Sequence, residues 1–225
     1  MSLNLDRSSW TRVKFGDVVR NVNDNTKNPG AAGIDRVIGL EHLDPGELRI
    51  QRWGDLSDET TFTRRVRAGQ TLFGKRRAYQ RKTAYADFDA VCSGDILIFE
   101  SADSARLLPE LLPFVAMTDG FYEKALETSA GSLSPRTRWA DLAKYEFDLP
   151  PLDQQRRIAG LLWTVESVLD DLRKCRTQVD SLVKVYLASL ESGQRQIADI
   201  VSIARAGATP SRARKDFFGG TIPWL

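Results

Sequence analysis

The sequence predicts an α+β domain with a mixed or antiparallel sheet and short helices, followed by a long coiled-coil helix. Three observations support this fold class. Short apolar segments, separated by turn residues, run through residues 10–149. Pro150 and Pro151 then end that region. From Ile158 onward, apolar residues recur every seven positions, which is the repeat with which two helices wind around each other.

The first 150 residues contain the pattern of a sheet with a few helices. Strands, with a short helix as the alternative for the first, are expected at residues 10–19, 36–43, 47–53, 70–74, 85–89, 95–100 and 145–149. Helices are expected at residues 107–115, 120–129 and 138–144. Loops rich in Asn, Gly, Pro or Ser separate them at residues 21–33, 44–46 and 131–136. The segment 95–100 is apolar enough to be a central strand.

The long helix is predicted from a heptad pattern between two end signals. Asp153 is the expected N-cap, and Ser192-Gly193 ends the pattern. The rod would have roughly 35–38 residues and a length of about 55 Å. Its core positions are Ile158, Leu161, Val165, Val168, Leu172, Cys175, Val179, Leu182 and Tyr186. Nothing within the same helix covers this stripe, so a partner helix is expected. The predicted boundaries are residues 1–150 for the domain, 151–192 for the helix and 193–225 for a further segment.

Composition limits the class of protein. Of the 225 residues, 42% are hydrophobic and 28% are charged, as in ordinary globular proteins. No apolar run has the length of a membrane span and the N-terminus lacks a signal-peptide core, so a cytoplasmic protein is expected. Cys92 and Cys175 are expected to be buried small hydrophobes in a reducing compartment. The single His42 is expected to be a surface or hydrogen-bonding residue and not a metal ligand.

Positive charge is concentrated in one segment. Between Glu59 and Asp87 there is no acidic residue, whereas the same stretch holds eight Lys and Arg. Within it, Gly74-Lys-Arg-Arg-Ala-Tyr-Gln-Arg-Lys82 mixes cations with an aromatic ring and an amide. Arginine and lysine bind phosphate or guanine, and glutamine can bind adenine, so the mixture favours nucleic-acid binding. The alternative is a solvated charged face.

Two catalytic patterns are incomplete. The spacing from Gly69 to Lys75 resembles a phosphate loop, but Arg76 stands where magnesium binding requires Ser or Thr. Asp95 and Glu100 resemble the metal-binding strand of a nuclease, but Ala102 stands where a lysine is needed. No adenine-methyltransferase motif is present either. The sequence therefore predicts binding without catalysis.

Three segments, in order, resemble the specificity subunits of type I restriction-modification systems. Residues 74–97 and 128–139 are similar to the target-recognition domain of that family. Residues 149–158, with Pro-Pro-Leu-Asp-Gln-Gln-Arg followed by heptads, are similar to its exit into a spacer helix. Residues 207–225 resemble the opening of a second recognition domain, so residues 193–225 are expected to be the stub of one.

The resemblance implies a non-catalytic recognition subunit. Such subunits choose the DNA sequence for two methyltransferase (M) subunits and a restriction (R) subunit, so S-adenosylmethionine and ATP are expected only on the partner subunits. Each recognition domain reads half of a split site in the major groove of double-stranded DNA, and the spacer helices set the distance between the halves. The expected DNA-binding residues are Lys75, Arg76, Arg77, Tyr79, Gln80, Arg81 and Lys82, with Ser134 and Arg136 from a neighbouring loop. Arg64, Arg65 and Arg67 are expected to attract the DNA backbone.

The family pattern has two recognition domains and two antiparallel helices, whereas this sequence has one of each. One hypothesis is that two copies pair their helices antiparallel around a twofold axis near Leu172, with Val165 beside Val179 of the other chain. Such a homodimer would specify an inverted-repeat bipartite site. A second hypothesis is that the chain is a piece of a longer subunit. A third is a coiled-coil adaptor that does not read DNA sequence.

Overall fold

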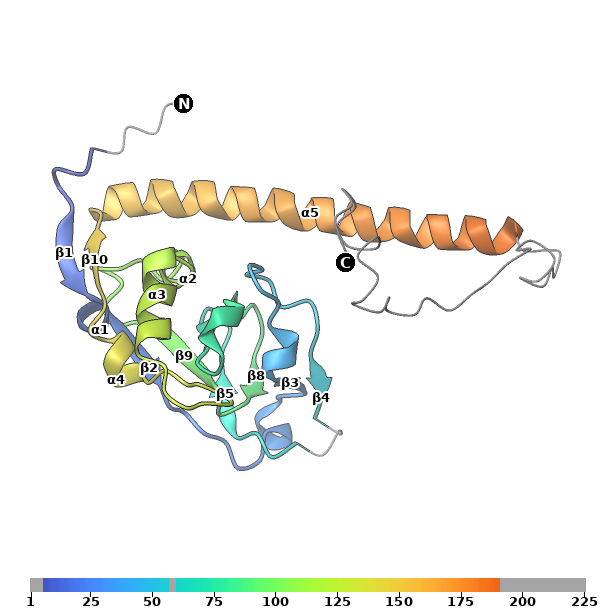
Figure 1. The fold of residues 1–225 in the computed structure, drawn as a ribbon, viewed down its shortest axis with the longest axis horizontal. Helices are drawn as coiled ribbons and strands as arrows, with labels where there is room; N and C mark the ends of the chain where they lie inside the picture. The colour runs from blue at the N-terminus through green and yellow to red at the C-terminus, as the bar shows by residue number, and fades with distance from the viewer. Residues whose placement is uncertain (1–5, 57–59, 191–225) are drawn as a thin grey trace, which may run out of the picture. The chain divides into compact units, whose positions relative to one another are not determined.

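The computed structural model describes residues 6–56 and 60–190 (Figure 1). Residues up to Arg173 belong to one compact unit, and the last described turns of the long helix, from Lys174, belong to a second. The predicted helix end at Ser192-Gly193 and the segment 193–225 lie outside the described residues.

Three sheets form the strand framework of the first unit. The central, antiparallel sheet has the order β2 (Val19–Val22), β9 (Ile96–Ser101), β6 (Thr71–Gly74), β7 (Thr83–Tyr85). The second, mixed sheet has the order β4 (Gly54–Asp55), β3 (Arg36–Ile38), β8 (Ala90–Cys92), β5 (Arg64–Val66). The third pairs β1 (Thr11–Lys14) antiparallel with β10 (Glu146–Leu149), which lie side by side in Figure 1. The predicted α+β class is confirmed.

The helices are short apart from the last one. The α-helices are α1 (Phe15–Val18), α2 (Leu112–Ala116), α3 (Asp119–Glu127), α4 (Trp139–Leu142) and α5 (Leu152–Leu190). The 3-10 turns are η1 (Gly30–Ala32), η2 (Leu40–His42) and η3 (Ala78–Gln80). At the end of η2, His42 accepts a hydrogen bond at Nδ1 from the N–H of Gly39, which confirms the hydrogen-bonding role expected for it.

Strand β9 separates two hydrophobic cores, which explains why its sequence is apolar without alternation. Leu97 and Phe99 pack into one core, while Ile96 and Ile98 pack into the other. Successive side chains of a strand point to opposite faces, so a strand buried on both faces must be apolar throughout. The prediction of a central strand here is confirmed.

The two cores have different walls. The first core joins the central sheet to the helices and holds a cluster of Phe15, Phe73, Phe99 and Phe121, with Phe73 and Phe121 edge to face at 5.3 Å. The second core joins the central sheet to strands β3, β5 and β8 through a cluster of buried aliphatic side chains that includes Ile38, Val66 and Leu72. Removing one buried phenylalanine side chain from such a cluster costs about 3–5 kcal/mol.

Several predicted elements differ from the structure. The strand predicted at residues 85–89 is wrong, because β7 ends at Tyr85 and residues 86–89 form the bend that leads into β8. The strand predicted at residues 36–43 ends at Ile38, and η2 follows it. Residues 47–53 do not form a strand; Leu48 and Ile50 are buried, but this segment joins the sheets only through a bridge between Arg49 and Tyr85. The helix predicted at residues 107–115 is shorter than expected, because turns occupy residues 109–111 and the helix runs only from Leu112 to Ala116. Before it, the N–H of Leu108 donates to the Gln155 side chain.

Helix α5 is held to the domain by two neighbouring glutamines. It has 39 residues and begins one residue before the predicted N-cap, so Asp153 lies in its first turn. Gln155 is fully buried; its Oε1 accepts from the N–H of Leu108, and its Nε2 donates to the carbonyls of Arg106 and Pro150. Gln154 accepts a hydrogen bond at 2.8 Å from the indole of Trp10. The Gln-Gln pair therefore joins the helix to loops on either side.

Further contacts continue along the same face of α5 within the first unit. The Trp163 indole donates to the carbonyl of Glu110 at 2.9 Å. Asp170 accepts from Gln51 at 2.9 Å, and Arg173 pairs with Glu47 at 3.3 Å. Ala159 is buried in the first core, and the Trp163 ring packs edge to face against Tyr85 and Phe114. Apart from Ile158, the positions of the apolar stripe take no part in these contacts.

Most of the predicted coiled-coil positions are exposed in the single chain. Those with at least 45% exposure are Leu161, Val165, Val168, Leu172, Val179, Leu182 and Tyr186. Ile158 differs because it packs against the first core. Cys92 is buried as expected, but Cys175 is exposed, so the prediction that both are buried is wrong for Cys175. No second helix covers its position within the described chain. No helix there combines the length and apolarity needed to cross a membrane.

Candidate nucleic-acid interface

The basic segment is the loop that connects β6 to β7. It leaves the sheet at Gly74, where a side chain would meet Leu40 Cδ2 at 3.0 Å, and it turns through η3. Arg77 and Arg81, on either side of η3, both have left-handed backbone conformations with φ of 53°. Between them Ala78 is buried in the first core. The loop is therefore a tight turn fixed to the domain at its centre.

Backbone hydrogen bonds attach this loop to a second one, residues 130–137. A single antiparallel bridge pairs Arg76 with Arg136. The N–H of Arg77 donates to the carbonyl of Pro135 at 2.8 Å, and the N–H of Thr137 donates to the carbonyl of Lys75 at 3.0 Å. The structure thus brings together the two segments in which the sequence predicted DNA-binding residues. We call this pair of joined loops the basic site.

One carboxylate lies between two arginines of the basic site. Asp95, just before β9, accepts from Arg136 Nε at 2.8 Å and from Arg76 Nη1 at 3.4 Å. Arg76 also donates from Nη2 to the Ser134 hydroxyl at 3.0 Å. The hydrogen bond from Arg136, against the effect of burial and with help from Arg76, lowers the pKa of Asp95 below its usual value.

Two further predicted residues are occupied by contacts within the domain. Arg81 pairs with Asp119 at the start of α3 and lies 4.6 Å from the ring centroid of Tyr122. Lys82 donates from Nζ to the carbonyl of Leu40 at 2.6 Å. Burial raises the pKa of Tyr122 to about 12, so its hydroxyl stays neutral in its hydrogen bond with Thr83.

The side chains of the remaining predicted residues have no partner in the described chain. Among the described residues, Lys75, Arg77, Tyr79 and Gln80 have neither an ion pair nor a side-chain hydrogen bond. Tyr79 is 56% exposed. Burial, together with the nearby charge of Arg64, lowers the pKa of Lys75. A phosphate would relieve this crowding of like charges.

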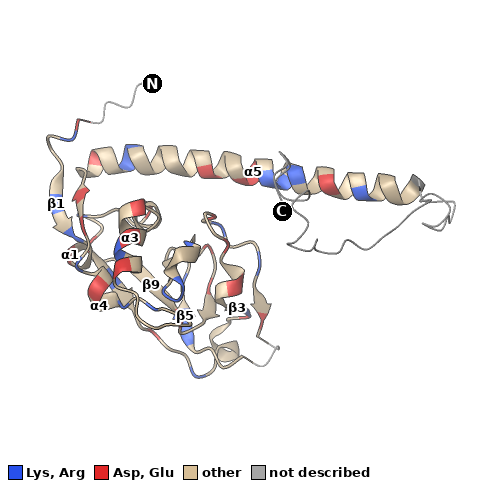
Figure 2. Cartoon of the chain, viewed as in Figure 1, with Lys and Arg blue, Asp and Glu red and all other residues tan. Residues whose placement is uncertain are grey.

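The other arginines of the acid-free stretch are engaged inside the domain. Arg64 donates to the carbonyls of Ile96 and Val22. Arg65 pairs with Asp89 at 3.1 Å and Arg67 with Asp24 at 2.6 Å. The backbone attraction expected of these three stays a prediction, but their charges are partly offset. The supporting carboxylates Asp95 and Asp119 were not among the predicted site residues, since both lie outside the basic segment. Figure 2 marks these charges along the ribbon.

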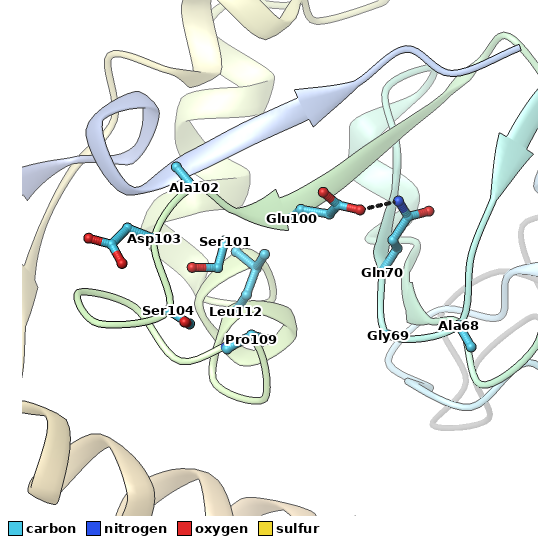
Figure 3. Close-up of a pocket in the computed structure, with 10 residues that line it drawn as sticks. All are labelled: Ala68, Gly69, Gln70, Glu100, Ser101, Ala102, Asp103, Ser104, Pro109 and Leu112. Carbon is cyan, nitrogen blue, oxygen red and sulfur yellow. Dashed lines mark hydrogen bonds between the residues drawn. The ribbon is translucent and has the colours of Figure 1, made fainter.

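The two carboxylates that resembled a nuclease strand do not share a site. Asp95 precedes β9, while Glu100 lies near its end, about 17 Å further along at 3.4 Å per residue. Glu100 lines a separate cleft of about 480 Å³, where it accepts a hydrogen bond from Gln70 (Figure 3). It also pairs with Arg20 at 2.6 Å. The described part of the chain holds no group of three His, Cys, Asp or Glu side chains placed for a metal ion.

Comparison with solved structures identifies the fold. A scan against protein-family models finds no match, and a sequence comparison with curated proteins finds none either. By structure, the chain is similar to the HsdS subunit from Thermoanaerobacter tengcongensis, with a TM-score of 0.60, 17% identity and coverage of 81% of this chain and 48% of that one. It is also similar to the type I restriction-modification S subunit from M. genitalium, with a TM-score of 0.57, 15% identity and coverage of 85% and 49%.

A third similar chain comes from a structure that concerns complex assembly and conformational transition of the type I R-M system. Its TM-score is 0.59 at 19% identity, with coverage of 84% of this chain and 52% of that one. The protein therefore has the fold of a type I restriction-modification specificity subunit. It spans about half the length of the solved chains that it matches.

Proposed function

We propose that this chain recognises DNA sequence for a type I restriction-modification system. It would direct adenine methylation by methyltransferase (M) subunits, and cleavage by a restriction (R) subunit, without catalysing either reaction. The basic site carries the proposal, because it presents unpaired cations, a ring and an amide from two joined loops on a domain with the specificity-subunit fold. S-adenosylmethionine and ATP would bind to the partner subunits.

The chemistry of the basic site fits duplex DNA. Lys75 and Arg77 have free donors for phosphate oxygens, which supply most non-specific affinity. Gln80 can form a pair of hydrogen bonds with adenine, and the forked donors of Arg76 and Arg136 suit guanine or phosphate. Tyr79 offers an exposed ring for a sugar or a base. The site thus combines groups for affinity with groups for sequence recognition.

A partner helix would complete the protein, and we propose that it comes from a second copy of the chain. The exposed stripe of α5 supports this pairing, since its heptad spacing is that of a coiled coil and, from Leu161 onward, the domain contacts a different face of the helix. Antiparallel pairing about Leu172 would place two recognition domains at opposite ends. The identical domains would then read an inverted-repeat, bipartite site.

Disulfide crosslinking tests the pairing. In a Cys175→Ser background, the double variant Val165→Cys, Val179→Cys should form an interchain crosslink under mild oxidation, because these positions face each other in the proposed register. The matched control is Ser167→Cys, Gln178→Cys, two exposed positions on the other side of α5, and it should stay monomeric on a denaturing gel. Equal crosslinking in both variants, or none in either, would contradict the register.

Methylation mapping tests the recognition function. The full chain is co-purified with methyltransferase subunits and expressed with them, and methylated adenines are mapped across the host genome. One bipartite motif is expected, and it should change when residues 75–82 and 130–137 are exchanged together for those of a different recognition domain. The control exchanges Arg156 and Arg157, exposed on α5, for glutamine and should keep the motif. A motif that survives the loop exchange would refute the site assignment.

A chain that binds no DNA at any salt concentration would instead favour the coiled-coil adaptor. In that case the stripe of α5 would still bind its partner helix, and the cations of the basic site would be no more than a solvated face. One titration of DNA binding against salt concentration therefore distinguishes the recognition function from the adaptor function.

A further inference from the structure

Asp95 is an unexpected residue in a surface that binds DNA. Its carboxylate repels phosphate, yet it lies within the basic site, with its side chain only 20% exposed. It is bound by both Arg76 and Arg136, whose side chains are 36% and 46% exposed. Arg76 Nε is buried without a partner, and Arg136 Nη1 also donates to the carbonyl of Ser134 at 3.4 Å. The donors that the two arginines keep for DNA are therefore the Nη hydrogens that do not bind Asp95 or Ser134.

The sheet fixes the position of this carboxylate. The carbonyl of Asp95 accepts from the N–H of Lys75 at 3.0 Å, and its own N–H donates to Ser93 Oγ at 3.2 Å. The next residue, Ile96, is paired with Gly74 in the central sheet. Asp95 therefore belongs to the rigid part of the domain, whereas the arginines that it binds project from loops.

The two arginines are held in defined orientations as a result. Arg136 binds both oxygens of Asp95, with Nε at 2.8 Å from Oδ1 and Nη2 at 3.3 Å from Oδ2. The guanidinium of Arg76 is held at two points, by Asp95 and by the Ser134 hydroxyl. Since a guanidinium is planar, two contacts set the direction of its remaining donors.

We propose that Asp95 is a positioning residue that determines sequence specificity by fixing Arg76 and Arg136 in the orientation in which they read DNA. The proposal rests on the function proposed above and names the residue on which discrimination depends. Asp95 does not touch DNA in this scheme. It lowers general affinity through its charge and raises the difference in affinity between the correct sequence and others.

The two effects have opposite signs, which makes the proposal testable. In Asp95→Asn, removal of one negative charge should leave binding to a duplex without the motif unchanged or make it tighter. Discrimination should fall by about 5- to 150-fold, because a bidentate arginine contact contributes this much against a wrong base. A merely structural role for Asp95 would lower both affinities together.

The experiment maps methylated adenines with the full chain and its methyltransferase partners, and measures binding to duplexes with and without the motif. The matched control is Asp148→Asn on β10, which loses the same charge and also breaks a pair with an arginine, Arg12. It should keep the motif. Ser134→Ala, which removes the second contact of Arg76 and leaves Asp95 in place, should weaken discrimination to a smaller extent and serves if Asp95→Asn does not fold.

The outcomes separate the two proposals. A wild-type chain that yields no motif overturns the proposed function and this inference with it. A wild-type motif that persists unchanged in Asp95→Asn and in Ser134→Ala overturns the inference alone. A motif that loses information in both variants, while binding to unrelated duplex is retained, supports it.

Discussion

The salt dependence of DNA binding gives the sharpest test of which cations of the basic site contact phosphate. Lys75 and Arg77 have no ion pair or side-chain hydrogen bond in the described chain, whereas Arg81 and Lys82 are engaged by Asp119 and the Leu40 carbonyl. Changing Lys75 and Arg77 to glutamine removes both free charges and keeps unbranched side chains. Unbranched side chains matter at Arg77 because its backbone is left-handed.

The magnitude follows from counterion release. Each phosphate contact contributes about 0.9 to the slope of log K against log salt, so the loss of two contacts should flatten the slope by about 1.8. At about 0.1 M salt this corresponds to an affinity roughly 60-fold lower. Fluorescence anisotropy with a labelled duplex, between about 50 and 200 mM salt, measures the slope directly.

The control for this measurement is the Arg156→Gln, Arg157→Gln variant. It loses the same charge from exposed positions of α5 and should keep the wild-type slope. Equal slopes for the wild type and the Lys75, Arg77 variant would refute the view that these two residues bind phosphate. Equal losses in the test variant and the control would show that only the net charge matters.

Three other results are expected. Burial raises the pKa of Cys92 to about 12, so Cys92 should react with a maleimide only after unfolding. The exposed Cys175 should react in the native monomer, and pairing of the helices should protect it as the protein concentration rises. Gln155→Ala leaves buried backbone groups unpaired, so it should lower the free energy of unfolding by about 2–4 kcal/mol, as measured by urea denaturation. Gln154 is only half-buried, and Gln154→Ala should lower the same free energy by about 1 kcal/mol. The pKa of Asp95 is lower in the folded state, so its ion pairs stabilise the fold above about pH 4 and this contribution is lost as the pH falls through the folded pKa. The difference in the free energy of unfolding between the wild type and Asp95→Asn should therefore be constant near neutral pH and vanish in strong acid. A difference that persists in strong acid would contradict the assignment.

Features that depend on short stretches of sequence could be predicted. The uniform apolarity of β9 reports burial on both faces, and the heptads of α5 report a helix with one apolar stripe. Both patterns are local, so neighbouring residues carry the whole signal. The exception within α5 is Ile158, which has the heptad spacing but packs against the first core of its own domain.

Features that depend on distant pairs could not be predicted. The bridge between Arg76 and Arg136 joins residues 60 positions apart, and no repeat or spacing in the sequence predicts it. Counting charges along the chain also overstated the field of the basic segment. Its arginines find their carboxylates, such as Asp95 and Asp119, on other elements. The sequence therefore indicated where cations gather, while the fold decides which of them stay unpaired.

The backbone link between the two loops of the basic site has a consequence for exchanging specificity between proteins. The main-chain hydrogen bonds from Arg77 to Pro135 and from Thr137 to Lys75 require both loops in this conformation, so a graft of residues 75–82 with another length or turn would lose them. A graft without Arg76 would also leave Asp95 and Ser134 without the guanidinium that contacts both. The smallest transferable unit is discontinuous, and it comprises both loops together with Asp95. Natural recombination that transfers one continuous stretch from residue 74 to residue 137 would carry all three at once, along with the strands and helices between them. The arrangement thus favours inheritance of the recognition surface as a whole block, and it disfavours assembly from short pieces.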